Sequence, residues 1–264
     1  MSTAHPARVW NYWLGGRDYF AADRTAGEQL SRDFPHLAQT ARAERAFLVR
    51  AVRFLAGPAR IRQFLDVGAG LPAGGNTHEI AQRIAPDTGV VYADDDPAVL
   101  VHARALLRNP MLASTPEGVV SYVDADLRDV TAILACSART LDLNKPVALI
   151  MLGVLGHIDD YGAARSIASQ LMDALPSGSY LAIADGVAGN GPVEDAQQRY
   201  NRAGPMPYHL RRPDQLARFF DGLDLIEPGV VACPRWKPDA LSTPGGAGSP
   251  PDEAAVYCGV ARKP

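Results

Sequence analysis

Residues 64–72 read Phe64-Leu65-Asp66-Val67-Gly68-Ala69-Gly70-Leu71-Pro72. The apolar run ends at an acid and then turns through two glycines, as a strand does when it passes through a tight loop into a helix. Glycine has no Cβ and tolerates positive φ, so the backbone N–H groups of such a loop can approach a ligand closely. The stretch predicts a cofactor loop. Glycine turns between strands and helices are common, however, so the rest of the chain has to show whether this loop binds a cofactor.

Strands and helices alternate on both sides of this loop. Apolar residues recur at helical spacing over 40–55, and a short apolar strand is predicted over 61–65, leading to Asp66. After the loop, Asn76-Thr77-His78-Glu79 has the form of a capping box at the start of a helix. Further strands are predicted at 90–93, 119–123, 146–152 and 180–184. This alternation predicts an α/β fold with a doubly wound, mostly parallel sheet.

The second half of the chain breaks the alternation once and then closes the sheet. Residues 187–222 hold a glycine-rich stretch, a polar helix over 194–202 and a short helix around Leu216, and are predicted as an insertion over the C-terminal edge of the sheet. Two closing strands are predicted over 223–231 and 255–261, which makes seven strands, with an antiparallel closing strand among them. The Pro- and Gly-rich loop 243–251 between them is expected to be mobile.

The N-terminal segment carries five aromatic residues around Gly15-Gly16, between Val9 and Phe20. Either it packs on the surface of the domain as a strap, or it covers the mouth of the cofactor site and brings Tyr12, Gly15 and Gly16 near the ligand. We expect residues 1–56 to form this helical strap and one helix, on the same domain as residues 57–264.

The composition narrows the class of protein. The chain has 264 residues, 47% of them hydrophobic, enough for a substantial core, and its formal net charge of −3 offers no basic face to nucleic acid. No segment resembles a signal peptide or reaches the roughly 20 apolar residues of a membrane span. The three widely spaced cysteines fit neither a disulfide framework nor a metal site. We therefore expect a cytoplasmic protein that acts on small molecules, without membrane or nucleic-acid partners and without a metal.

Three predicted strands run into carboxylates at their C-terminal ends: Asp66, Asp94 and Asp126. In an open parallel sheet this edge is where ligands bind. Asp94 either accepts from the ribose hydroxyls of a nucleoside or, with Asp95 and Asp96, belongs to a turn and helix cap. Asp126 is either a solvated loop acid or an acceptor for an adenine amino group. Asp66 is expected to order the glycine loop and to face the positive part of a ligand.

The class of nucleoside follows from charge. Residues 68–73 satisfy the dinucleotide pattern Gly-x-Gly-x-x-Ala, but Pro72 removes a donor and several residues separate the glycines from the next helix. Carboxylates at three strand ends would also repel a diphosphate, whereas they suit a cationic nucleoside without phosphate, the sulfonium S-adenosylmethionine (SAM). An oxidoreductase that uses NAD(P) stays as the alternative.

The order of these features resembles a class I SAM-dependent methyltransferase, with its Rossmann-like sheet. More closely, 6–18, 64–72, 75–79, 91–97 and 259–264 resemble a bacterial family of S-adenosyl methyltransferases long described as a domain of unknown function. The resemblance covers nearly the whole chain. Two positions depart from the family pattern, Gly156 before His157 and Ala73-Gly74 in the loop.

The resemblance implies SAM as cofactor and methyl transfer to an unidentified small-molecule acceptor; a regulatory module that binds SAM without catalysis is a further alternative. His157 is the first candidate for a base, although a helix start or a packing role explains it equally. Tyr200, Tyr208 and His209 are candidates for the acceptor side, with a solvated polar helix as the other explanation for Tyr200. The residues expected at the cofactor are Tyr12, Gly15, Gly16, Asp66, Gly68, Gly70, Asn76, Thr77, Asp94, Asp95, Asp126 and Leu127.

Overall fold

The computed structural model describes residues 4–33, 35–72, 74–101, 118–189, 191–203, 207–237 and 255–264. Within these ranges the sheet has eight strands, in the order β3-β2-β1-β4-β5-β8-β6, with β7 paired to β8. The parallel strands are β1 (Gln63–Val67), β2 (Gly89–Asp94), β3 (Val119–Asp124), β4 (Ala148–Leu152) and β5 (Tyr180–Gly186). β8 (Val256–Arg262) runs antiparallel to β5. The winding reverses between β1 and β4, so the sheet is doubly wound as predicted.

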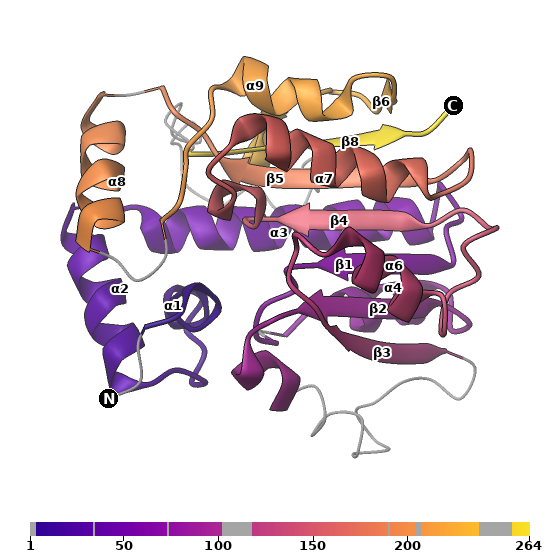
Figure 1. Ribbon diagram of the computed structural model, residues 1–264, viewed down its shortest axis with the longest axis horizontal. Coiled ribbons are helices and arrows are strands. Elements are labelled where there is room, and N and C mark those ends of the chain that lie inside the picture. The colour runs from indigo at the N-terminus through magenta and orange to yellow at the C-terminus, as the bar shows by residue number, and fades with distance from the viewer. Residues whose placement is uncertain are drawn as a thin grey trace.

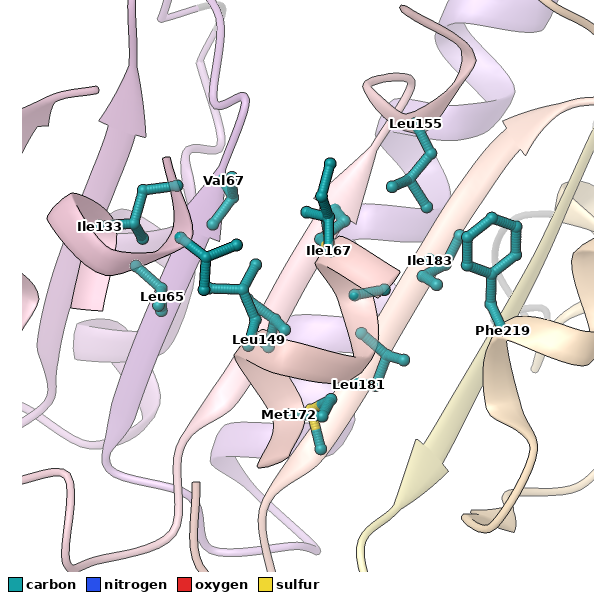
Figure 2. Close-up of a cluster of buried hydrophobic side chains, with 14 of the residues drawn as sticks. Leu65, Val67, Ile133, Leu149, Leu155, Ile167, Met172, Leu181, Ile183 and Phe219 are labelled. Atoms are coloured by element: carbon teal, nitrogen blue, oxygen red, sulfur yellow. The ribbon is translucent and has the colours of Figure 1, made fainter. Parts of the chain in front are cut away.

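Helices cover both faces of this sheet because successive strand side chains point to opposite sides. The covering helices are α3 (Leu37–Ala56) and α4 (Thr77–Ile84) on one face and α6 (Val130–Ser137) and α7 (Tyr161–Asp173) on the other. Leu65 and Leu149 pack toward α6 and α7, where they meet Ile133 and Ile167 (Figure 2). Their neighbours Phe64 and Ile150 pack toward α3 and α4. Burial on both faces explains the continuous apolar run of β4.

The N-terminal segment is a pair of helices, α1 (Pro6–Trp13) and α2 (Ala21–Asp33). A small core of its own, formed by Val9, Trp13, Leu30 and Ala41, joins both helices to the beginning of α3. Figure 1 shows α1 and α2 beyond the carboxyl ends of the parallel strands, on the side to which their arrows point. The rest of the segment 1–56 is α3, which packs against one face of the sheet.

The insertion after β5 contributes α8 (Gly191–Ala203), α9 (Pro213–Ala217) and the 3-10 helix η2 (Arg218–Phe220). α8 is at the same end of the sheet as α2 (Figure 1). Phe219 and Phe220 are buried against the α7 face. The insertion therefore reaches from the strand ends to one face of the sheet.

The prediction of one continuous closing strand over 223–231 was wrong. It is two short strands, β6 (Asp224–Leu225) and β7 (Val231–Ala232), both antiparallel to β8. Pro228 has no N–H to donate to a ladder, and Gly229 turns the chain at φ 84°. The sheet consequently has eight strands where seven were predicted.

Smaller differences concern boundaries. β1 begins and ends two residues later than predicted, so Asp66 lies within the strand. The predicted third helix is described only as far as 101, and its remaining residues lie outside the described ranges, as does the loop 243–251. No helix in the described ranges is long and apolar enough to span a membrane.

Candidate active site

A cavity of about 290 Å³ lies at the carboxyl ends of the parallel strands, beneath α1 and beside the first half of α3. This is the edge of an open α/β sheet at which ligands bind. The cavity is lined by nine of the residues singled out from the sequence: Asp66, Gly68, Gly70, Asp94, Asp95, Asp126, Leu127, His157 and Tyr208. The topology thus brings strand ends far apart in the chain to one site.

The glycine loop forms the floor of this cavity. Gly68 and Gly70 both have positive φ, 73° and 63°. A Cβ on Gly68 would lie 2.5 Å from Cγ2 of Val154, which follows β4. Glycine is therefore required at position 68 both for its backbone conformation and for the close approach of the β4 exit.

Asp94 holds the second half of that loop in place. Its Oδ2 accepts from the backbone N–H of Gly70 at 2.8 Å, and its Oδ1 accepts from the N–H of Asp96 at 2.9 Å. The Gly70 N–H is therefore donated within the protein and is not free for a ligand. A carboxylate has about four lone-pair sites, so each oxygen keeps capacity for one more donor, such as a ribose hydroxyl.

Asp66 is a buried acid beneath the loop. The Thr77 hydroxyl donates to its Oδ2 at 2.6 Å, and burial raises the pKa of Asp66 to about 6, against a smaller lowering by that hydrogen bond. Burial disfavours the charged form because it removes water from the carboxylate. Asp66 therefore carries its charge at neutral pH at a cost, and a cation at this point of the cavity would offset it.

The third strand end supplies Asp126 and Leu127, both half-buried at the cavity. Asp126 is not isolated, because its carboxylate is 3.2 Å from Nη1 of Arg128 and accepts from the Arg128 N–H at 2.8 Å. Asp95 is exposed and lines the cavity beside Asp94. These acids form one wall, on the β2 and β3 side.

Several residues expected at the cofactor lie outside the cavity lining. Tyr12 stacks edge-to-face on Tyr19 at 5.3 Å, and Gly16 packs so closely on Asn11 that a Cβ would collide with its side chain. Gly15 turns the end of α1 at φ 80° with open space around it. Their geometry shapes the α1–α2 connection, whereas the face of α1 that lines the cavity holds Ala7, Trp10 and Asn11.

Asn76 and Thr77 also lie behind the cavity. The predicted capping box does not form: no side-chain hydrogen bond from Asn76 caps α4, and Glu79 accepts from the N–H of Gly75 at 3.0 Å, one residue before the cap position. The Asn76 side chain instead joins Glu79 at 2.7 Å and Arg45 at 2.8 Å. The competing charged partners explain why Asn76 does not cap.

His157, Tyr208 and their neighbours form the opposite wall, at the ends of β4 and β5. His157 Nδ1 is 3.1 Å from the carbonyl of Pro207, and its ring meets that of Tyr208 edge-to-face at 5.0 Å. A carbonyl can only accept, so Nδ1 carries the proton and Nε2 keeps its lone pair. Burial lowers the pKa of His157, which keeps the imidazole neutral at pH 7.

Gly156 makes room for this wall. A Cβ at position 156 would overlap the ring of Tyr208, whose hydroxyl accepts from the N–H of Gly186 at 3.1 Å. His209 points elsewhere, with Nδ1 3.4 Å from Asp159, and is not among the lining residues. Tyr200 belongs to α8, and Gln197 of that helix lines the cavity.

Sequence reasoning missed two features of the site. Glu44 of α3 is buried at the cavity, and the roof is clamped by Arg8 of α1, whose guanidinium contacts Asp23 at 2.9 Å and Asp96 at 3.2 Å. Helical periodicity places Glu44 on α3 but cannot show which strand end it meets. Pro6 at the start of α1 was the available signal for a helix there.

The comparison with protein families decides the identity. The model of a family described as S-adenosyl methyltransferase matches residues 1–264. The chain belongs to this S-adenosyl methyltransferase family. Its cofactor is S-adenosyl-L-methionine, and its activity is methyl transfer. No curated protein matches the chain.

Solved structures of similar chains agree with this assignment. A DUF574 family protein from Streptomyces avermitilis MA-4680 is 44% identical, with a TM-score of 0.91 over 99% of this chain and 98% of that chain. A Thermobifida fusca YX protein, provisionally described as a methyltransferase, is 37% identical, with a TM-score of 0.87 over 99% and 95%. Magnesium protoporphyrin IX methyltransferase from Synechocystis PCC 6803 is 12% identical, with a TM-score of 0.56 over 97% and 93%, a likeness of fold alone.

The residues of the cavity fit the cofactor of this S-adenosyl methyltransferase. SAM carries a positive sulfonium and hydroxyl and amino donors but no phosphate. Asp94 keeps spare acceptor capacity for hydroxyls, and Asp66 is a buried acid that a cation would offset. The loop offers no free Gly70 N–H of the kind that a diphosphate needs. The donor and acceptor set therefore matches a cationic nucleoside.

Proposed function

We propose that the protein methylates a small molecule that binds between α1 and the ends of β4 and β5. One observation carries this proposal: beyond the acids of β1 and β2 the cavity continues into an apolar space under the N-terminal helices. Its walls there are Trp10, Trp13, Leu14, Leu30, Leu37 and Leu48. α1 covers this space, so a compact acceptor fits it better than a macromolecule does.

On the cofactor side we assign three roles. Asp94 accepts from the ribose hydroxyls, Asp126 accepts from the adenine amino group, and Asp66 orders the loop and faces the positive part of the cofactor. Bound SAM supplies an activated methyl group on a sulfonium. The protein's own contribution is to hold the acceptor nucleophile in line with that methyl, and such positioning is worth effective molarities on the order of 10⁵ M or more.

His157 is our candidate for proton acceptance. Its neutral ring with a protonated Nδ1 leaves Nε2 able to take a proton from the nucleophile of the acceptor, and it lines the cavity beside Tyr208. Tyr208 orients the ring through their edge-to-face contact at 5.0 Å. Proton acceptance by His157 would add to the rate acceleration that positioning supplies, and would not replace it.

The test is turnover with a library of small acceptors, measured as release of S-adenosyl-L-homocysteine (SAH), together with calorimetry of SAM, SAH and NAD. We expect SAM and SAH to bind, NAD not to bind, and one class of small molecule to be methylated. Binding of SAM with no turnover across the library would favour a non-catalytic module, and tight NAD binding without SAM binding would sink the proposal.

A further inference from the structure

Glu44 is a buried acid at the cavity wall. Glu44 is 5% exposed and lines the cavity from α3. Within the described part of the chain, no hydrogen bond or ion pair to this carboxylate is formed. Buried carboxylates are normally paired, because leaving one without a partner is costly. Glu44 therefore lacks the partner that its charged form would need.

The groups around Glu44 do not supply that partner. Gly153 lies against it, so close that a Cβ there would be 3.2 Å from Oε1. Burial and the like charge of Asp185 both raise the pKa of Glu44. The neighbouring cation Arg45 lowers this pKa by less, and its guanidinium donates to the Gly74 carbonyl at 2.7 Å and to Asn76 at 2.8 Å instead of to Glu44. A cation brought by a ligand would satisfy Glu44.

The position of Glu44 indicates which ligand this is. Its neighbours Gly153 and Asp185 belong to the exit of β4 and to β5, whereas the acids assigned to the nucleoside belong to β1, β2 and the exit of β3. β4 and β5 lie on the other side of β1 from β2 and β3. Glu44 therefore lies over the half of the cavity that holds the proposed acceptor.

The cavity also offers an aromatic surface. Trp10 and Trp13 both line the cavity, with ring centroids 5.6 Å apart and planes at 70°. Indole faces attract cations and pack well on apolar groups. A buried carboxyl group and two indole rings that line one cavity are a combination suited to an organic ammonium ion.

We propose that the methyl acceptor carries a cationic nitrogen on an apolar or aromatic body, and that Glu44 is the charge partner of that nitrogen. This inference rests on the proposed function, because it assigns a class to the acceptor of the same site. It makes Glu44 a specificity-determining residue. Hydrogen bonds to charged groups predict a preference of about 10- to 100-fold for the cation over a neutral analogue.

The experiment measures binding to the full chain saturated with SAH, by calorimetry. The probes are 2-phenylethylammonium, the neutral 3-phenylpropan-1-ol and the anionic 3-phenylpropanoate. We expect the wild type to bind the ammonium probe at least tenfold more tightly than either of the others. Glu44→Gln should lose this preference with SAH affinity unchanged within twofold, and Glu44→Asp should keep part of it.

A matched control is Asp124→Asn, which removes an exposed acid outside the cavity lining and should leave the preference intact. If wild-type protein does not bind SAH, the proposed function fails. If it binds SAH but shows no preference for the ammonium probe, only the assigned acceptor class fails. A tenfold loss of SAH affinity in Glu44→Gln with the preference retained would make Glu44 a cofactor contact and overturn the inference.

Discussion

The buried acid Asp66 makes the stability of the protein depend on pH. Its carboxylate is buried beneath the cofactor loop, and the Thr77 hydroxyl is its hydrogen-bond donor at 2.6 Å. Its pKa is raised from 3.8 to about 6, so between these values the unfolded chain releases a proton that the native protein keeps. The favourable contribution of Asp66 to stability is complete below pH 3.8 and is lost as the pH rises through 6.

Asp66→Asn should therefore remove part of the pH dependence of stability. Two pKa units correspond to roughly 3 kcal/mol, so relative to the wild type the variant should gain up to about that much between pH 4 and pH 7. Urea unfolding of both proteins across this range measures the difference. Parallel stability curves would show that Asp66 has an ordinary pKa.

Asp94 is the residue whose loss should affect the cofactor most directly. Asp94→Asn replaces an acceptor with a donor at the Gly70 and ribose contacts, and should weaken SAH binding by about 1.5–3 kcal/mol, roughly 10- to 100-fold. The control is Asp124→Asn, because Asp124 is the exposed partner of Asp94 in register on β3 and lies outside the cavity lining. Equal losses in both variants would mean that bulk charge, and not contact, binds the cofactor.

At the scale of elements, α1 is held over the cavity by a buried ion cluster. Arg8 contacts Asp23 of α2 and Asp96 after β2, and His5 Nδ1 is 2.9 Å from Asp96. The two acids are 0% and 1% exposed. Asp96 also accepts from the N–H of Ala98 and so caps the helical turn 97–101. The same carboxylate therefore joins α1 to this turn.

Arg8→Ala should loosen this roof. Removing one partner leaves buried carboxylates uncompensated, which typically costs 3–5 kcal/mol, so amide hydrogen exchange in α1 and α2 should accelerate and SAH affinity should fall. Arg24→Ala is the matched control, since the exposed Arg24–Glu28 pair at 3.7 Å contributes about 0.5 kcal/mol or less. Unchanged exchange in α1 would show that apolar packing alone holds it.

These elements differ in how far the sequence predicts them. The five parallel strands follow from apolar runs that end in acids or glycines, and topology rules then place Asp66, Asp94 and Asp126 at one edge. Glu44 and Arg8 could not be placed, because helical periodicity fixes the face of a residue on its own helix and not the strand end or partner helix that it meets. The broken closing strand was missed because 223–231 has strand-like composition on both sides of Pro228.

At the scale of the molecule, the buried apolar residues form two large cores on the sheet and one small core at the N-terminal helices. The two large cores on the faces of the sheet hold no residue from 4–33 among their buried members, whereas α1 and α2 share a small core with the beginning of α3. α3 is the connection, because its first turns meet α1 and its remainder packs on the sheet. We propose that the chain forms one domain in which α1 and α2 complete the site without being needed for the sheet.

Deletion of residues 1–36 tests this proposal. The truncated protein should still unfold cooperatively, because both faces of the sheet keep their cores, but it loses the cavity lining that α1 provides. In the full chain, SAH at 100 times its Kd should add about 2.7 kcal/mol of stability, seen as a rise in Tm, and in the truncated protein it should add close to none. A non-cooperative melt would mean that α1 and α2 are required for the core, and a retained SAH shift would mean that the cofactor binds without its roof.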